Sequence, residues 1–146
     1  MFDIEQSVVF VLSKATQRIW AVFREEFRDY ALTPPQYILI AILWKADNIS
    51  QAELAKRSRI DRSTLGGIID RMEKIGFVER EPSAEDPRAN RVRLSGKGRA
   101  LFEEDLSDAA YRVRRRLTEK LTPGEYKQLK QLLNKLVVGV SGHQSA

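Results

Sequence analysis

The chain has 146 residues, of which 42% are hydrophobic and 31% are charged, a composition that indicates one globular domain and not a disordered segment. It contains no cysteine, which excludes a disulfide framework, a thiolate redox sensor and a cysteine-based zinc site. The longest early apolar run, Val8 to Leu12, is too short for a membrane span or a secretory signal, so we expect a cytoplasmic protein with no membrane partner.

The excess positive charge is confined to one stretch of the chain. Residues 56 to 99 contain 12 Lys/Arg against 7 Asp/Glu, a net charge of +5, whereas the rest of the chain contains 13 residues of each sign. A local excess of this kind attracts a polyanion such as DNA. A charged run can equally be a solvated face, so charge alone leaves both interpretations open.

Residues 3 to 30 carry apolar side chains at helical spacing, which predicts one long amphipathic helix. These side chains are Ile4, Val8, Val11, Leu12, Ala15, Ile19, Val22, Phe23 and Phe27, with Phe10 and Trp20 to one side. A chain of this size cannot easily cover so broad an apolar surface, which suggests contact with a second copy of the chain. An ordinary intramolecular face is the alternative, and the two are compatible.

A threonine and two prolines at 33 to 35 predict the start of a second helix, because proline is tolerated in the first helical turn. Residues 36 to 46 are apolar on most sides, so we expect a buried, central core helix there. The chain then turns, and Asn48 with Ile49 are expected to form a very short strand that joins a later sheet.

Two short helices are predicted next. Ser50 and Glu53 have the spacing of a capping box, which predicts a helix over residues 51 to 58. Asp61 is a second N-cap candidate, for a helix that runs to about Ile75.

This second helix is amphipathic, with a polar outward face. Its predicted buried stripe consists of Leu65, Ile68, Ile69, Met72 and Ile75. Its outward face consists of Ser63, Gly67, Asp70 and Lys74, flanked by Thr64 and Arg71. Gly76 follows and can take the left-handed conformation that ends a helix.

Gly66 and Gly67 lie inside the same helix, where each costs about 1 kcal/mol relative to alanine. Close approach of the helix backbone to a partner would explain them. Tight packing against a neighbouring helix is the alternative.

Two runs with period-2 alternation, residues 77 to 82 and 90 to 95, predict a β-hairpin with a charged tip at 83 to 89. Two short helices joined by a tight turn and followed by such a hairpin predict a winged helix-turn-helix, whose second helix can enter the major groove of DNA.

Two helices are predicted beyond the hairpin. Ser95 can cap a helix that runs to about Lys120, and Thr122 with Pro123 and Glu125 predict the start of the last helix. The last helix has a narrow apolar stripe, expected to pack on the partner chain's terminal helices: Tyr126, Leu129, Leu132, Leu133, Leu136, Val137 and Val140. From Gly139 onward the sequence is small and polar, and we expect it to fray.

Three features of the chain occur together in a specific order: DRSTLGGIIDRMEKIGFVER at 61 to 80, the Asp86-Pro87-Arg88 tip, and RVRLSGKGRAL at 91 to 101. In this order and spacing they resemble the MarR-type (multiple antibiotic resistance regulator) transcription factors, over essentially the whole chain. The resemblance implies a mainly α (α+β) fold in a single domain. Its expected parts are a winged helix-turn-helix at 33–99, dimerisation helices at 1–32 and 100–140, and a frayed tail at 141–146.

The resemblance also implies how the chain meets DNA. The second helix of the motif would read the major groove and the wing arginine would enter the minor groove. The implied DNA-binding residues are Arg62, Ser63, Thr64, Gly67, Arg71, Lys74, Asp86, Arg88 and Arg91. The implied partners are a second copy of the chain and double-stranded DNA with a pseudo-palindromic operator.

Finally, the resemblance implies an inducer pocket between the dimerisation helices and the DNA-binding part, so that a small molecule would release a repressor. The aromatic candidates for this pocket are Trp20, Phe23, Tyr37, Trp44 and Tyr111. The candidates for pairing a carboxylate or phosphate are Arg18, Arg24 and Arg28. An aromatic acid or its thioester conjugate is the hypothesis for the ligand, and an ordinary core is the alternative for these aromatic side chains.

Enzyme chemistry and cofactors are not expected. The only histidine, His143, lies in the predicted tail, which excludes a Ser-His-Asp triad and a histidine-based metal site. The carboxylate runs at 25–26 and 103–105 are interpreted as solvated helix faces. Gly66 and Gly67 lie inside a helix, so they do not form a nucleotide-binding loop.

A winged helix that binds only proteins is the remaining alternative, because the fold hosts such modules. The wing argues against it: Arg88, Arg91 and Arg93 together have no evident use in a protein-binding module.

Overall fold

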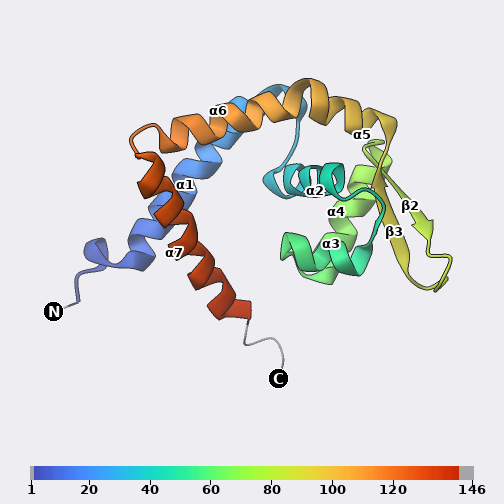
Figure 1. Cartoon of the computed structure of the whole chain (residues 1–146), viewed down its shortest axis with the longest axis horizontal. Coiled ribbons are helices and arrows are strands. Elements are labelled where there is room, and N and C mark those ends of the chain that lie inside the picture. Colours follow the sequence, from blue (N-terminus) through green and yellow to red (C-terminus); the bar gives the residue numbers. More distant parts are fainter. Residues whose placement is uncertain (1, 142–146) are drawn as a thin grey trace.

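The computed structural model describes residues 2–141, with side chains described as far as residue 137. Its elements in chain order are η1 (Ile4–Gln6), α1 (Val8–Glu26), η2 (Arg28–Tyr30), α2 (Pro34–Lys45), β1 (Ile49–Ser50), α3 (Gln51–Ser58), α4 (Arg62–Lys74), β2 (Val78–Pro82), β3 (Asn90–Leu94), α5 (Gly96–Leu101), η3 (Phe102–Leu106), α6 (Ser107–Thr118) and α7 (Pro123–Ser141). Figure 1 shows α1 and α7 on one side, the bundle α2–α4 with the β2–β3 hairpin on the other, and α6 extending between them. This arrangement confirms the predicted winged helix-turn-helix with flanking helices.

The first helix is shorter than the predicted span of 3 to 30. Ser7 is extended, with φ −70° and ψ 137°, and its hydroxyl accepts a hydrogen bond from the Val9 N–H at 3.2 Å. This cap starts α1 anew after the short 3₁₀ turn η1. At the other end Phe27 leaves the helical conformation, η2 follows, and Ala31 is left-handed with φ 52°. Apolar spacing could not distinguish these 3₁₀ turns from α-helix.

Helix α2 is the central core helix, as predicted. Thr33 and Gln36 form a reciprocal capping box: the Thr33 N–H donates to Gln36 Oε1 at 3.0 Å and the Gln36 N–H donates to Thr33 Oγ1 at 3.4 Å. Leu39, Ile40 and Leu43 are completely buried. The helix begins at Pro34, within the proline pair, and not at Gln36.

The two helices of the motif begin at the predicted caps. The Ser50 hydroxyl accepts the Glu53 N–H at 3.0 Å and starts α3, and Asp61 caps α4. Four members of the predicted stripe on α4 are buried, but Ile75 is 43% exposed. It is the C-cap of α4, and the left-handed Gly76 (φ 84°) that follows ends the helix.

The sheet is antiparallel with strand order β1-β3-β2. In β2–β3, Val78 pairs with Leu94, and the buried Val92 pairs with Arg80 on one side and with Ile49 of β1 on the other. Strand β1 starts one residue later than predicted, because Asn48 is left-handed with φ 58° and cannot take part in a strand.

The helix predicted from Ser95 to about Lys120 is interrupted by a π-helical turn. The Ser95 hydroxyl accepts the Gly98 N–H at 3.0 Å, as expected for a cap. After α5 the chain widens into η3, and α6 then ends at Thr118. Trp44 of α2 packs its ring on Phe102 with 4.9 Å between centroids, and its Nε1–H donates to Glu103 Oε1 at 3.0 Å.

Four of the five carboxylates in the runs at 25–26 and 103–105 are exposed, as expected for helix surfaces, and only Glu26 is partly buried. Three of them also bind neighbouring side chains. Glu103 binds Trp44, as just described. Glu26 accepts hydrogen bonds from Arg112 at 2.7 Å and from Arg116 at 3.1 Å, which hold α1 against α6 and lower the pKa of Glu26. Glu25 accepts a further bond from Arg116 at 2.6 Å.

The last helix starts at the predicted capping box, in which the Glu125 N–H donates to Thr122 Oγ1 at 3.2 Å and the Thr122 N–H donates to Glu125 Oε2 at 3.4 Å. It continues to Ser141, so the described part of the chain ends within the stretch from Gly139 that is expected to fray. The rest of the predicted tail, including His143, lies outside the described residues. Within residues 2–141, none of the helices combines the length and apolar character that a bilayer crossing requires.

Two glycines of α5 provide a test of the packing of this helix on the wing. A Cβ atom at Gly98 would lie 2.2 Å from the backbone oxygen of Phe77, whereas a Cβ at Gly96 would meet nothing within 4 Å. We predict that Gly98→Ala lowers the free energy of unfolding by about 1 to 3 kcal/mol, because a backbone must move. Gly96→Ala is the matched control and should be neutral or stabilise by up to about 1 kcal/mol. Urea denaturation of the two variants measures both values, and equal effects would contradict the packing.

Candidate functional site

The first turn of α4 is organised by the carboxylate of Asp61. Its Oδ1 accepts the Thr64 N–H at 2.9 Å and the Ser63 hydroxyl at 2.8 Å, and its Oδ2 accepts the Thr64 hydroxyl at 2.7 Å. The backbone bond from Thr64, followed by the two hydroxyl bonds, lowers the pKa of Asp61 from 3.8 to about 2. Because both hydroxyl protons point at Asp61, Ser63 and Thr64 present oxygen lone pairs to a partner.

The outward face of α4 is open around its glycines. A Cβ at Gly67 would meet nothing within 4 Å, and one at Gly66 would meet only the side chain of Gln51, at 3.7 Å. Tight packing against another helix of the described chain therefore does not explain them. Arg62, Arg71 and Lys74 are exposed around this face.

Asp70, the one acidic residue predicted on that outward face, forms an ion pair with another part of the same chain. Arg80 of β2 donates hydrogen bonds to Asp70 and, at 3.1 Å, to Glu73. Helix α4 is therefore fixed to the wing by an ion cluster, and the negative charge of Asp70 is neutralised beside the basic residues of the face.

The wing arginines differ in what they bind. Arg88 at the tip is 93% exposed, with its Nε 3.5 Å from Asp86, whose Oδ1 also accepts the Arg88 N–H at 3.0 Å. Arg93 is paired with Glu79 at 2.9 Å and with Glu81 at 2.8 Å. Arg91 donates to the side chain of Asn48 at 3.3 Å and to its carbonyl. Two of the three arginines taken as a sign of DNA binding thus have structural roles, which weakens that argument.

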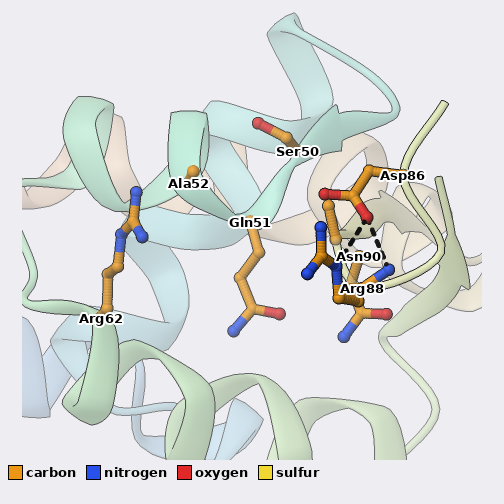
Figure 2. Close-up of a pocket in the computed structure, with 8 residues that line it drawn as sticks. Ser50, Gln51, Ala52, Arg62, Asp86, Arg88 and Asn90 are labelled. Carbon is orange, nitrogen blue, oxygen red and sulfur yellow. Dashed lines mark hydrogen bonds and ion pairs between the residues drawn. The ribbon is translucent and has the colours of Figure 1, made fainter.

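A cleft of about 310 Å³ lies between α3, the start of α4 and the wing tip. Figure 2 shows Arg62 and Arg88 on opposite sides of Gln51, whose side chain points into the space between them. The cleft brings together three predicted DNA-binding residues, Arg62, Asp86 and Arg88. Sequence reasoning missed Gln51 and Asn90, and only the fold places them here. The Oε1 atom of Gln51 is buried and has no hydrogen-bond partner within the described chain.

The predicted ligand residues are not gathered at one place. Trp20 and Arg24 line a largely apolar cleft of about 670 Å³ together with Leu32, Thr33, Pro34, Pro35, Ile38 and Ile60. This cleft lies between α1, the start of α2 and the turn that joins α3 to α4. We call it the α1–α2 cleft.

Phe23 and Tyr37 line a second, smaller cleft of about 290 Å³, which also includes Phe27, Arg114 and Tyr126. Phe23 and Phe27 stack with 4.0 Å between ring centroids, and Tyr37 lies 5.0 Å from Phe27. Burial raises the pKa of Tyr37. These rings are in large part core, as the alternative interpretation held.

The other candidates line neither cleft. Trp44 is held by Phe102 and Glu103, as described above, and Tyr111 is 62% exposed on α6. Arg18 and Arg28 lie outside both linings, and each contributes weakly to lowering the pKa of Glu25, after the larger contribution of Arg116.

Comparisons with known proteins agree with this geometry. The family model described as "MarR family" matches residues 32–89. The chain is 31% identical over 140 residues to the HTH-type transcriptional repressor NicR of Pseudomonas putida, covering 93% of this chain and 85% of NicR.

Solved structures give the same result. BpsR of Bordetella bronchiseptica, whose DNA binding is described as regulated by 6-hydroxynicotinic acid, superimposes with a TM-score of 0.88 at 27% identity, covering 94% of this chain and 97% of that chain. A mutant of Escherichia coli MarR complexed with operator DNA superimposes with a TM-score of 0.82 at 25% identity, covering 93% of this chain and 99% of that chain. The chain therefore belongs to the MarR family of transcriptional regulators and is not an enzyme.

Proposed function

We propose that the chain is a repressor that binds a pseudo-palindromic operator as a homodimer and is released by a small aromatic acid. The observation that carries the DNA-binding part is the cleft between α4 and the wing, with Arg62 on one side and the exposed Arg88 on the other. DNA phosphates bind such arginines, and the polar outward face of α4 then lies toward the major groove. The E. coli MarR structure with operator DNA supports this docking, since the fold matches over nearly the whole chain.

Within this interface, each group has a distinct role. Arg71 and Lys74 would lie along the groove, Ser63 and Thr64 would accept hydrogen bonds from base amino groups at the helix tip, and Arg88 would enter the minor groove. Asp86 would hold the Arg88 backbone in place at the tip.

The dimer is supported by apolar surface that the single chain leaves open. In α1 the side chains of Val8, Val9 and Val11 are exposed, and in α7 Leu132 and Leu136 are exposed by 52% and 54%. Contiguous apolar surface of this kind marks an interaction site. Both helices belong to the parts of the chain assigned to dimerisation.

The effector is supported by the α1–α2 cleft. Trp20 offers an aromatic face, the two prolines and Ile38 offer apolar contacts, and Arg24 offers a cation for a carboxylate. Regulation of BpsR by 6-hydroxynicotinic acid supports an aromatic acid as the ligand class. The thioester conjugate of such an acid would place the same ring in the cleft.

Selection of bound duplexes from random DNA at low salt tests the function. We expect a pseudo-palindrome with half-site centres about 10 bp apart, and sedimentation at about twice the chain mass of 16.8 kDa.

Leu136→Glu should give a folded monomer that loses operator binding, because this residue is exposed in the single chain. A wild-type monomer, or selected DNA without symmetry, would overturn the dimeric repressor, and absence of DNA binding would favour a protein-binding module.

Two wing variants separate a direct contact from overall charge. Arg88→Ala should weaken binding to all duplexes, reduce the salt slope by about 1 and remove any preference for A·T-rich flanks. Arg93→Ala removes the same charge from the same hairpin, but this arginine is already paired with two glutamates, so it is the matched control. Titrations at several salt concentrations measure both, and equal losses would argue against the assignment of Arg88.

Arg71→Ala should instead change preference at particular base pairs, by about 1 to 3 kcal/mol.

Gly67 tests how closely α4 approaches DNA. Because a Cβ there meets nothing in the free chain, Gly67→Ala should raise the free energy of unfolding by up to about 1 kcal/mol. The same methyl group should lower operator affinity by holding the helix away from the groove. Gly66 lies beside Gln51, and Gly66→Ala should show the same two effects, higher stability and lower operator affinity, to a smaller extent. Melting curves and DNA titrations decide it, and a Gly67→Ala protein that is both more stable and fully active would remove Gly67 from the interface.

A further inference from the structure

The carboxylate of Asp61 fixes the direction of two hydroxyl protons at the start of α4. Its Oδ1 accepts the Ser63 hydroxyl at 2.8 Å, and its Oδ2 accepts the Thr64 hydroxyl at 2.7 Å. The pKa of Asp61 is lowered to about 2, chiefly because the Thr64 N–H donates to Oδ1 at 2.9 Å, so the carboxylate is ionised at neutral pH. An ionised carboxylate accepts hydrogen bonds and has no proton to donate. Each hydroxyl oxygen therefore has only lone pairs left for a partner.

A serine or threonine hydroxyl without such a neighbour rotates, so that it donates or accepts as its partner requires. A rotating hydroxyl bonds to any base and discriminates little between them. At Ser63 and Thr64, rotation would break a hydrogen bond to a charged group, which is stronger than one between neutral groups. The two side chains are therefore acceptors only, and Asp61 is the residue that restricts them.

The two hydroxyls lie on a surface that the described chain does not cover. Asp61, Ser63 and Thr64 are all exposed. Further along α4, a Cβ at Gly67 would meet nothing within 4 Å. In the cleft beside this turn, Gln51 Oε1 is buried and lacks a hydrogen-bond partner within the described chain, and Figure 2 shows its side chain pointing into the cleft. A partner that docks here meets both the hydroxyl oxygens and an unsatisfied amide.

Acceptors of this kind can read the orientation of a base pair in DNA. In the major groove each pair presents an amino group on one base, adenine or cytosine, and a carbonyl oxygen on the other, thymine or guanine. A hydroxyl that only accepts binds the amino group, whereas against the carbonyl it places lone pairs opposite lone pairs. Inversion of the pair, from A·T to T·A or from C·G to G·C, exchanges the two groups.

We propose that Asp61 determines part of the operator specificity, by making Ser63 and Thr64 obligate acceptors that select base pairs whose amino group lies toward the tip of α4. Asp61 touches no base in this arrangement and acts through the two hydroxyls, so it is a positioning residue. The inference rests on the proposed function, because it requires the start of α4 to lie in the major groove.

The base pairs that the two hydroxyls read are located first. In the duplex selected by the wild-type protein, each base pair of one half-site is inverted in turn, and titration gives the loss of affinity. Thr64→Val replaces the hydroxyl with a methyl group of similar size and should remove the loss at the pair read by Thr64. Ser63→Ala locates the pair read by Ser63 in the same way. If neither variant changes the loss at any position, the hydroxyls read no base and the proposal is overturned.

Asp61→Asn then changes the proton direction at one hydroxyl only. Asparagine caps a helix as well as aspartate does, so the melting temperature should hardly change. Its carbonyl oxygen must take the Oδ1 position, because the Thr64 N–H needs an acceptor there. The amide nitrogen then replaces Oδ2 and donates to Thr64 Oγ1. The Thr64 proton is thereby free to turn toward DNA, whereas Ser63 still faces an oxygen that only accepts.

The two base pairs should respond differently to this substitution. Inversion of the pair read by Thr64 should cost the wild-type protein roughly 10-fold in affinity, the lower end for hydrogen bonds to charged groups, and Asp61→Asn less than about 2-fold. At the pair read by Ser63, the loss should persist in Asp61→Asn, which makes this pair the internal control. Removal of one negative charge strengthens binding to all duplexes alike and leaves these ratios unchanged. An unchanged loss at the pair read by Thr64 would overturn the proposal.

Asp61→Ser is a second variant that retains a good cap. Its single hydroxyl can donate as well as accept, so neither Ser63 nor Thr64 is restricted, and the inversion losses should fall at both pairs. Melting curves identify which variants are folded, and inversion losses that persist in folded Asp61→Ser would contradict the role of Asp61.

The same titrations separate this inference from the proposed function. If the wild-type protein selects no duplex, the repressor function fails and the inference fails with it. If it selects a pseudo-palindrome but Asp61→Asn and Asp61→Ser keep every inversion loss, the repressor function stands and only the role of Asp61 is overturned. Loss of discrimination at the predicted pairs, with binding retained, supports both.

Discussion

Helix α2 is apolar on nearly all sides, so other elements must pack around it to shield it from water. Its buried side chains are covered by α3, α4, α5 and β3, so the winged helix-turn-helix half forms around it. Its two ends then reach different parts of the molecule. The proline end forms part of the α1–α2 cleft, and the opposite end places Trp44 against the π-turn η3. The same burial that stabilises this half therefore also connects the cleft, the helix-turn-helix and the turn that leads into α6.

Only some of the positively charged residues in the basic stretch at 56–99 are available to bind a partner. Arg80, Arg91 and Arg93 bind acidic or carbonyl groups within the hairpin and its neighbours. Arg80 joins the wing to α4, Arg91 joins it to Asn48 before β1, and Arg93 joins its two strands. Arg62, Arg71 and Lys74 remain exposed along α4, and Arg88 remains exposed at the wing tip. The charge of the stretch was a sound guide to a nucleic-acid partner, but only the ion pairs show which residues are free to meet it.

Local chemistry explains what could be predicted from the sequence. Five caps, at Thr33, Ser50, Asp61, Ser95 and Thr122, depend on groups within three residues of each other, and the structure has all of them. The errors arise where a local pattern is compatible with two structures, or where elements distant in the sequence determine the position of a side chain. Apolar spacing did not show the cap at Ser7 or the π-turn. Trp20 and Phe23 are three residues apart on one helix, yet they line different clefts, because the position of α2 separates them.

The π-turn at Phe102–Leu106 has a geometric consequence for the whole chain. Its wider hydrogen-bonding pattern accommodates one extra residue, which shifts the phase of the following helix by about 100° relative to an uninterrupted α-helix. Helix α5 can therefore turn its glycine side to the sheet while α6 turns Ala109 inward and packs on α1. A single inserted residue thus sets the rotational offset between the wing and the long helices, and the clamp of Trp44 on Glu103 lies at the point where that offset is fixed.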